Sequence, residues 1–303
     1  MIKSVKLSAT TLAIIVGITG IILFSSKAIL VKLAYRYDVD SLSLLLLRML
    51  FALPFYVFIA LVKKPAHPDR IFRADYIYLI LFGVIGYYLA SYLDFLGLQF
   101  IKASLERVIL FVYPTLVLLI SRIFMGTRTS ITQILAILIS YAGIIVTFSQ
   151  ELGLIGGSYD IIIGGLLVFL SALSYASYLV GSGWLIPKFG STTFTSYAMI
   201  VSCTCVIVHY LLSDQRSILI YPAEVYLISF TMAIIATVIP SYLISFAIKG
   251  LGASDFSIYG SLGPISTIVL AHLFLDETLN WIQILGTMVV IMGVTFISSN
   301  RQT

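Results

Sequence analysis

Ala103-Ser104-Leu105-Glu106-Arg107, followed by Pro114, begins a pattern that the chain contains twice. The second copy starts at Ala253-Ser254 and reaches Pro264, so the shift is 253 − 103 = 150 residues. Flanking identities keep the same shift: Ser91/Ser241, Tyr92/Tyr242, Leu93/Leu243, Phe124/Phe274, Gln133/Gln283, Leu135/Leu285 and Gly143/Gly293. We therefore predict two related halves, residues 1–152 and 153–303.

The composition is typical of a membrane protein. Hydrophobic residues make up 60% of the chain, charged residues only 10%, and the mean hydropathy is +1.09. Soluble domains contain about 25% charged residues. Apolar runs long enough to cross a hydrocarbon core of about 30 Å recur along the chain, whereas the alternating segments of a transmembrane barrel are absent. These features predict an all-α polytopic membrane protein.

Hydropathy and turn residues predict ten transmembrane helices separated by short loops. The predicted spans are 11–33, 42–62, 76–98, 104–121, 130–149, 161–185, 192–212, 224–248, 254–275 and 280–298. Because no loop is long enough for a soluble domain, any functional site must be built from the helices. The shift of 150 residues corresponds to five spans, an odd number, so equivalent helices would cross in opposite directions. Inverted repeats are typical of secondary transporters, which bind their substrate near the midplane between the repeats; duplication for stability alone is the alternative.

The distribution of basic residues predicts the orientation. With the N-terminus inside, eleven Lys and Arg fall in cytoplasmic segments: Lys3, Lys6, Lys63, Lys64, Arg70, Arg73, Arg122, Arg128, Lys188, Lys249 and Arg301. Five fall outside: Lys32, Arg36, Lys102, Arg107 and Arg216. The positive-inside rule then places both termini in the cytoplasm. It also accounts for the net charge of +5, and no basic patch interleaved with aromatic residues indicates nucleic acid.

Several motifs in both halves are similar to one known family. They are Phe24-Ser25-Ser26 before Lys32, Leu47-Arg48-Met49-Leu50-Phe51, Gly97-Leu98-Gln99-Phe100-Ile101-Lys102-Ala103-Ser104 with Pro114, and Leu251-Gly252-Ala253-Ser254 with Pro264 and Leu275-Asp276-Glu277. In this order and at this shift, they resemble the EamA-type transporters of the drug/metabolite transporter superfamily. The resemblance implies two inverted five-helix repeats around a central cavity, and the export, exchange or import of small metabolites, amino acids or drugs.

The chain departs from the family pattern at three places. Phe24 stands where a tryptophan is usual, and the charged pair Glu106-Arg107 lies early in the fourth span. Gly126-Thr127 replaces, in the first half, the acidic pair that the second half keeps as Asp276-Glu277. The two halves therefore differ most in their charged residues.

Five ionisable residues lie inside the spans of the first half, all in the half of the membrane predicted to be outer: Lys27, Arg48, Asp94, Glu106 and Arg107. Each is costly in lipid and needs a partner or a function. We expect Arg48 and Arg107 to donate to Asp94 and Glu106, with Lys27 left over. The ion pairs of this cluster could close an extracellular gate or hold the helices together. Alternatively, one acid couples transport to protons, or a cation holds a substrate carboxylate.

Aromatic and hydroxyl residues on the predicted cavity-lining helices are candidates for substrate contacts, because Tyr combines a flat apolar ring with a hydrogen-bonding hydroxyl. With Lys27, the candidates are Tyr87, Ser91, Tyr113, Tyr175, Tyr178, Ser241, Tyr242 and Tyr259. Core packing or a place in the interfacial aromatic belt is the alternative for each. Pro114 and Pro264 each remove a helical hydrogen bond and so permit kinks that suit alternating access.

These observations predict a secondary transporter of the inner or plasma membrane that moves a small amino acid-like or similar organic solute, by efflux or exchange. Uptake carriers and drug exporters of the same fold are alternatives. An enzyme is disfavoured because the three histidines show no metal-ligand spacing and Gly260-Ser261-Leu262-Gly263 is not a nucleophile elbow; a channel is the other class considered. We expect no cofactor and no metal site, and leave protons as coupling ion and a homodimer open.

Overall fold

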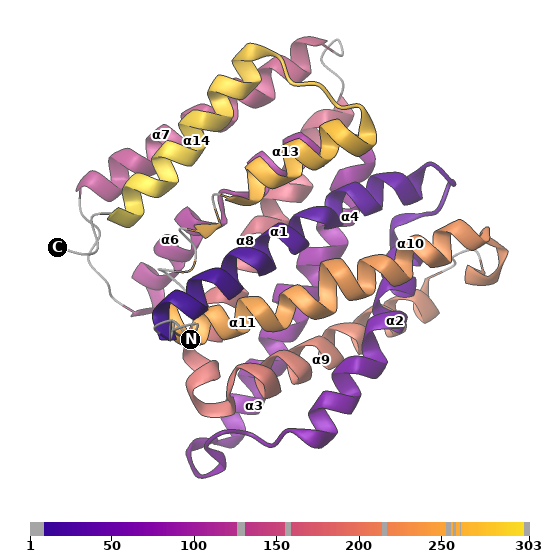
Figure 1. Ribbon diagram of the computed structural model, residues 1–303, viewed down its shortest axis with the longest axis vertical. Coiled ribbons are helices and arrows are strands. Elements are labelled where there is room, and N and C mark those ends of the chain that lie inside the picture. The colour runs from indigo at the N-terminus through magenta and orange to yellow at the C-terminus, as the bar shows by residue number, and fades with distance from the viewer. Residues whose placement is uncertain are drawn as a thin grey trace, which may run out of the picture.

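The computed structural model describes residues 9–125, 131–154, 159–213, 217–252, 256, 259–260 and 262–299, and the elements in this part of the chain are all helical (Figure 1). The first half contains α1 (Ala9–Tyr35), α2 (Ser41–Val62), η1 (Pro68–Arg70), α3 (Arg73–Gly83), η2 (Val84–Leu89), α4 (Ala90–Phe100), α5 (Ala103–Leu110), α6 (Tyr113–Met125) and α7 (Ile131–Leu154). The second contains α8 (Tyr159–Phe189), α9 (Ser191–Leu212), η3 (Ile218–Ile220), α10 (Ala223–Ala233), η4 (Ile234–Val238), α11 (Ile239–Leu251), α13 (Leu262–Leu275) and α14 (Trp281–Ser299).

Helix boundaries in the two halves follow the same shift as the sequence. Helix α2 begins at Ser41 and α9 at Ser191; α7 begins at Ile131 and α14 at Trp281. The π-helical segments η2 and η4 begin at Val84 and Ile234, again 150 residues apart. A π-helical turn is rare and is frequent at functional sites. Its recurrence at equivalent positions indicates that the two halves share their irregularities as well as their helices.

Seven helical segments in the described part of the chain are long and apolar enough to cross a membrane: α1, α2, α3–α4, α5–α6, α8, α9 and α10–α11. Helices α13 and α14 are apolar but shorter within the described part of the chain. The chain is therefore a multi-pass helical membrane protein. The total of ten spanning helices stays a prediction.

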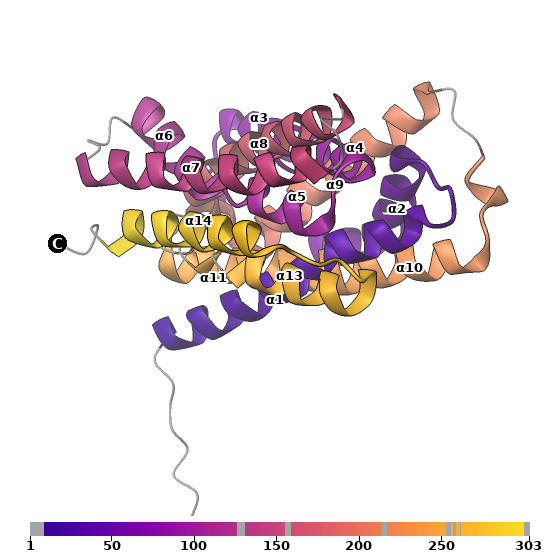
Figure 2. The same cartoon turned by 90° about the horizontal axis from the view of Figure 1, so that it is seen from above.

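Helices from the two halves pack against each other throughout the molecule. Helix α1 contacts α11 and α13, α2 contacts α9, and α4 contacts α8. Helices α7 and α14 lie side by side in both views (Figures 1 and 2). A Cβ added to Gly143 of α7 would lie 2.6 Å from the carbonyl oxygen of Gly286 on α14. Small residues at this contact let the two helices approach closely, as is common for helices that pack in lipid.

The α5–α6 segment is interrupted before Pro114. Phe111 and Val112 form a turn between α5 and α6, so Pro114 lies in the first turn of a new helix. Pro264 likewise lies in the first turn of α13, which begins at Leu262. A proline there costs no helical hydrogen bond, because the first N–H groups of a helix have no partner within it. Both prolines thus mark helix starts rather than kinks inside one continuous helix. The second Ala-Ser pair, residues 253–254, lies outside the described residues.

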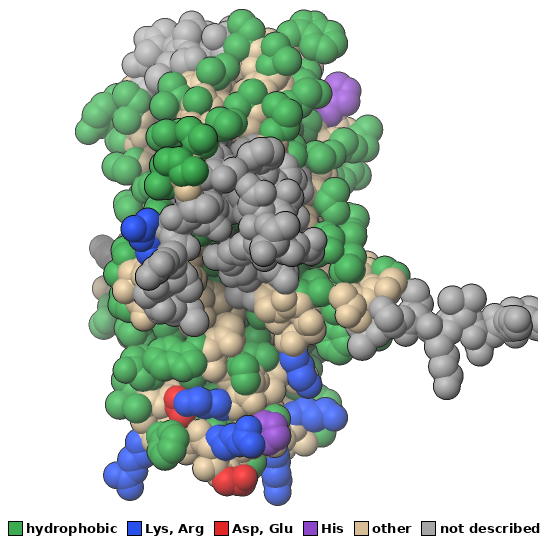
Figure 3. Space-filling model, turned by 90° about the vertical axis from the view of Figure 1, so that its left-hand side faces the viewer, with side chains coloured by type: hydrophobic (Ala, Val, Ile, Leu, Met, Phe, Trp, Pro, Cys, Tyr) green, Lys and Arg blue, Asp and Glu red, His purple; other side chains and the backbone are tan. Residues whose placement is uncertain are grey.

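One end of the molecule is rich in basic side chains. Figure 3 shows the left-hand face of Figure 1, towards which α1 begins and α14 ends, and Lys and Arg gather in its lower part, whereas hydrophobic side chains dominate its flanks. Lys188 Nζ lies 2.6 Å from Asp75 Oδ1, and this ion pair links α8 to the start of α3. Positive charge on one side of a membrane protein is the expected mark of its cytoplasmic face.

Candidate solute-binding site

Four ionisable side chains from α1, α4 and α5 meet inside the molecule. Lys27 Nζ lies 2.5 Å from Asp94 Oδ2 and 3.9 Å from Glu106 Oε1, so one ammonium group faces two carboxylates. Arg107 Nε lies 3.9 Å from Glu106 Oε2. All four are buried, and neither oxygen of Glu106 has a hydrogen-bond partner among the described residues. The cluster is therefore compact and only partly satisfied by hydrogen bonds.

The expected pairing of this cluster is wrong in two respects. Lys27 is the central cation rather than the residual one, and Arg48 forms no ion pair with a described acid. Arg107 approaches Glu106 as expected, but its hydrogen bonds go elsewhere. The reason is geometric: the rotation of each helix brings Lys27 between α4 and α5, and sequence spacing does not specify rotation.

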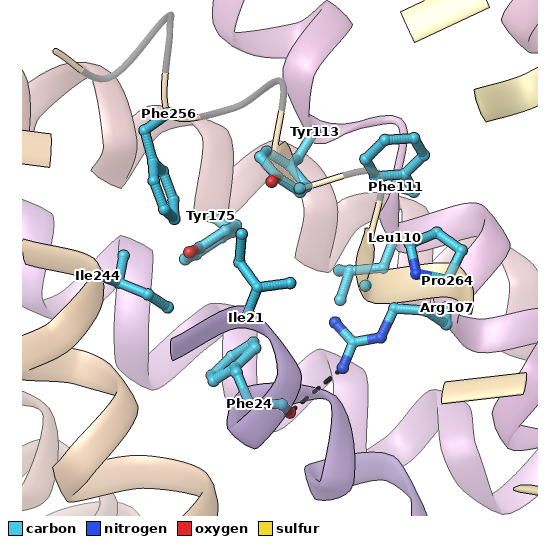
Figure 4. Close-up of a pocket in the computed structure, with 12 residues that line it drawn as sticks. Ile21, Phe24, Arg107, Leu110, Phe111, Tyr113, Tyr175, Ile244, Phe256 and Pro264 are labelled. Carbon is cyan, nitrogen blue, oxygen red and sulfur yellow. Dashed lines mark hydrogen bonds between the residues drawn. The ribbon is translucent and has the colours of Figure 1, made fainter. Parts of the chain in front are cut away.

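Arg107 connects three helices. Its Nε donates to Thr267 Oγ1 of α13 at 2.9 Å, and its Nη2 donates to the backbone oxygen of Phe24 at 3.3 Å. The guanidinium also lies 5.6 Å from the centre of the Phe24 ring, within the range of a cation–π contact. Figure 4 shows Arg107 reaching towards the Phe24 backbone from the α5 side. Arg107 therefore holds α1 of the first half and α13 of the second half to α5.

Arg48 of α2 is in a different environment. Its side chain is 2% exposed, and its guanidinium lies 4.8 Å from the centre of the Phe95 ring. Its Nε is buried with no hydrogen-bond partner in the described part of the chain. A buried arginine with unused donors is exceptional, because desolvating a charge without compensation is costly.

Two cavities lie between the halves beside these residues. The first is lined by Ile21, Phe24, Arg107, Leu110, Phe111, Tyr113, Tyr175, Ile244, Phe256, Gly260, Gly263 and Pro264 (Figure 4). The second is lined by Phe24, Lys27, Arg48, Gly86, Tyr87, Ala90, Ser91, Leu110, Ser171, Tyr175, Thr237, Ser241 and Ile244. Each has a volume of ≈ 30 Å³. That is room for about two water molecules, so both of these cavities are contracted in this structure.

The structure brings most of the predicted site residues to these cavities. Tyr113 and Arg107 line the first, Tyr175 lines both, and the second receives Lys27, Arg48, Tyr87, Ser91 and Ser241. Pro264 also lines the first cavity, whereas Pro114 lines neither. Asp94 and Glu106 lie behind the lining, bound to it through Lys27.

Three predicted tyrosines do not line either cavity. Tyr178 packs edge-on against Tyr87, with 4.5 Å between the ring centres. The Tyr242 hydroxyl is hydrogen-bonded to Ser196 Oγ at 2.8 Å, and Tyr259 lies in the helical turn before α13. For Tyr178 and Tyr242, packing around the site is therefore the observed arrangement. The Tyr178 ring supports Tyr87, which lines the second cavity.

Three further residues that the sequence did not single out as site residues line the cavities: Phe24, Ser171 and Thr237. Phe24 contacts both cations, since Lys27 Nζ lies 5.0 Å and the Arg107 guanidinium 5.6 Å from its ring centre. Its position in the family motif could have identified it. Ser171 is one of four serines on α8, and Thr237 is one of several hydroxyl residues along α10–α11, so no sequence pattern distinguishes these two from their neighbours. Thr237 lies in the π-helical segment η4, which the sequence did not reveal.

Glu277 forms an unexpected contact between the halves. Its carboxylate accepts hydrogen bonds from the backbone N–H groups of Ala103, at 2.9 Å, and Ser104, at 3.0 Å, and from Ser104 Oγ at 2.5 Å. A carboxylate at a helix N-terminus is favourable because it satisfies free N–H donors and complements the helix dipole. The acid after α13 thereby caps α5, the helix that carries Glu106 and Arg107.

The repeated helices, the long apolar spans and the polar cavities between halves define a polytopic helical membrane protein built from two copies of one unit. A family model described as the EamA-like transporter family matches twice, over residues 11–149 and 162–299. The chain belongs to this family and is a membrane transporter.

Individual relatives agree with this assignment. The chain is 31% identical over 275 residues to "Uncharacterized transporter YcbK" of Bacillus subtilis (strain 168), covering 88% of this chain and 86% of that protein. It is 24% identical over 223 residues to "Uncharacterized transporter YyaM" of the same organism, covering 73% of each. A solved crystal structure shares the fold with a TM-score of 0.69 and 14% identity, over 96% of this chain and 99% of that chain.

Proposed function

We propose that the protein is a secondary transporter that moves a small organic solute across the cell membrane by alternating access. The observation that carries this proposal is the second cavity, where Lys27 and Arg48 of the first half meet Thr237 and Ser241 of the second. A site shared by two halves changes its accessibility when the halves move, which is the arrangement used by transporters with inverted repeats.

The contracted volume supports a conformational cycle. Room for about two waters is too little for a metabolite, so the halves must separate before a solute binds. Helix breaks at Phe111–Val112 and Gly260, each next to a proline-containing first turn, offer places where this movement can occur. In this proposal, residues 1–152 and 153–303 rock against each other as inverted repeats, with both termini in the cytoplasm.

Protons are the coupling ion in this proposal, and Glu106 is the residue that carries them. It is fully buried, both of its oxygens lack hydrogen-bond partners among the described residues, and Lys27 and Arg107 lie at 3.9 Å. Asp94 is engaged by Lys27 at 2.5 Å and is less free to exchange a proton. Acidic residues inside membrane proteins commonly serve as proton relays.

Counterflow in proteoliposomes tests the proposal. Vesicles that contain purified protein are loaded with unlabelled solutes from a metabolite panel and diluted into the corresponding labelled solute. A carrier accumulates label transiently above its external concentration, because unlabelled solute leaves through the same site. A channel only equilibrates the label, and such a result for every solute transported would contradict alternating access.

A further inference from the structure

We propose that the transported solute is a small organic anion and that Arg48 binds its carboxylate. This inference rests on the proposed transport function and specifies the chemistry of its site. It follows from three features of the second cavity: which charges line it, which of those charges already have partners, and how the guanidinium of Arg48 is held.

The charged lining of both cavities is entirely cationic. Lys27 and Arg48 line the second and Arg107 lines the first, whereas no acidic residue appears in the described lining of either. Asp94 and Glu106 lie behind Lys27 instead. A solute in this space therefore meets positive charge and hydroxyl groups. An ammonium group on the solute would find no carboxylate to pair with.

Two of the three cations are already engaged by the protein. Lys27 Nζ is bound to Asp94 at 2.5 Å. Arg107 donates to Thr267 and to the backbone of Phe24, with Glu106 nearby. Neither needs a solute to complete its interactions. Arg48 differs, since no hydrogen bond or ion pair connects its guanidinium to any described residue.

The contact with Phe95 explains how Arg48 is held ready for a ligand. The ring lies 4.8 Å from the guanidinium carbon and stabilises the cation through its π face. An aromatic contact of this kind uses no N–H donor. The planar fork of donors that remains matches the two oxygens of a carboxylate.

Hydroxyl groups on the same cavity complete the site. Ser91 lies on α4 one turn before Asp94, lines the cavity and makes no side-chain hydrogen bond in the described part of the chain. Its hydroxyl is available to the carboxylate or to a neighbouring polar group of the solute. Phe24, Tyr87 and Tyr175 supply apolar surface for the remainder. The site therefore fits a compact carboxylate with one negative charge, matching the one unpaired cation.

Ligand-induced thermal stabilisation of the purified protein tests this inference. The probes are three acids, benzoate, lactate and leucine, and their amides benzamide, lactamide and leucinamide. Each amide keeps the solute skeleton and removes the carboxylate. We expect benzoate or lactate to raise the melting midpoint and the matching amide to have no effect. Equal stabilisation by acids and amides would overturn the inference, as would stabilisation by none of the acids. Leucine binding more tightly than both other acids would overturn the assignment of a simple anion, because the cavity would then also accommodate an ammonium group.

Substitutions at Arg48 test whether this residue binds the carboxylate of the solute. Arg48→Met should weaken binding of the acid about 10- to 100-fold, the range expected when a hydrogen-bonded charge pair is lost. Arg48→Lys keeps the charge without the fork and should give an intermediate affinity. Lys188→Met is the matched control, because it removes a paired cation of α8 that lines neither cavity. Unchanged acid binding by folded Arg48→Met would overturn the assignment.

Counterflow separates this inference from the transport proposal. If the wild-type protein binds benzoate or lactate through Arg48 but shows no counterflow, the result supports the anion site and contradicts the transport proposal. If neutral or cationic solutes show counterflow and the acids neither stabilise the protein nor show counterflow, the result supports transport and overturns the anion site.

Discussion

Lys27 and Asp94 illustrate how individual residues determine this site. Their charged atoms lie 2.5 Å apart on α1 and α4, and both side chains are almost fully buried. Removing one partner of a buried pair leaves the other charge uncompensated, which costs about 3–5 kcal/mol. We expect Lys27→Met and Asp94→Asn each to lower the melting temperature strongly, whereas the double variant recovers part of the loss. A double variant as unstable as the sum of both would contradict a direct pair.

Glu106 should behave differently from Asp94, because no described residue donates a hydrogen bond to it. Glu106→Gln removes the proton-carrying group and keeps the shape of the side chain. We expect a smaller loss of stability than for Asp94→Asn, because Lys27 lies 3.9 Å from Glu106 and 2.5 Å from Asp94, and we expect counterflow to be retained. Accumulation of solute driven by an imposed pH gradient should disappear. Glu224→Gln, at an exposed acid at the start of α10, should leave this accumulation unchanged. Persistent accumulation in Glu106→Gln would exclude this residue as the coupling group.

The sequence indicated that Lys27, Arg48, Asp94, Glu106 and Arg107 lie inside spans, but it did not predict most of their partners. Hydropathy and helix rise are enough to show that Lys27, Arg48 and Asp94 lie inside spans. Partner choice depends on helix rotation and crossing, which set whether α1 or α2 faces Asp94. Arg48 is a further example of a partner that the sequence did not predict, because its guanidinium contacts the Phe95 ring rather than an acid.

At the scale of elements, the π-helical segment η2 depends on one glycine. A Cβ added to Gly86 would lie 2.0 Å from the Cβ of Tyr178, so η2 and α8 are in backbone-to-side-chain contact there. Gly86→Ala should destabilise the protein by about 1–3 kcal/mol, the usual cost of overpacking, and disturb Tyr87 beside it. Gly263→Ala is the control, because its nearest neighbours would lie at 3.8 Å. Thermal unfolding of both variants checks this; equal midpoints would contradict it.

Glu277 joins two elements from different halves, and we expect it to latch them in the contracted state. Glu277→Gln loses the charge that caps α5, so the cavity should open more often. In a background with Cys203→Ser and Cys205→Ser, a cysteine at Ser91 should then react faster with a soluble thiol reagent. Asp276→Asn, at the adjacent exposed acid, is the matched control and should not change the rate. Equal rates in both variants would contradict a latch.

Element boundaries were more predictable than element contacts. The repeat shift and the apolar runs located the helices, because both are written in residue order. The π-helical segments and the cap by Glu277 were not predicted. Each depends on a contact with a distant segment, and in the first half the equivalent positions, Gly126-Thr127, lack an acid altogether. The acid that makes the capping contact is therefore present at this repeat position in the second half and not in the first.

At the scale of the whole molecule, the basic residues at one end predict the orientation in the membrane (Figure 3). Basic loops resist translocation, so the end that contains the α2–α3 and α8–α9 connections should stay in the cytoplasm. A fluorescent protein fused after Thr303 should fluoresce, and alkaline phosphatase at the same site should be inactive. Fusions after Tyr37, in the connection between α1 and α2, should give the opposite result.

A fusion after Leu154 tests the inverted repeat. Five crossings, the number predicted for each half, would bring the end of the first half to the side opposite its start, so this fusion should behave like the Tyr37 fusion. Phosphatase activity after Thr303 would overturn the orientation, and a cytoplasmic signal after Leu154 would overturn the inverted repeat.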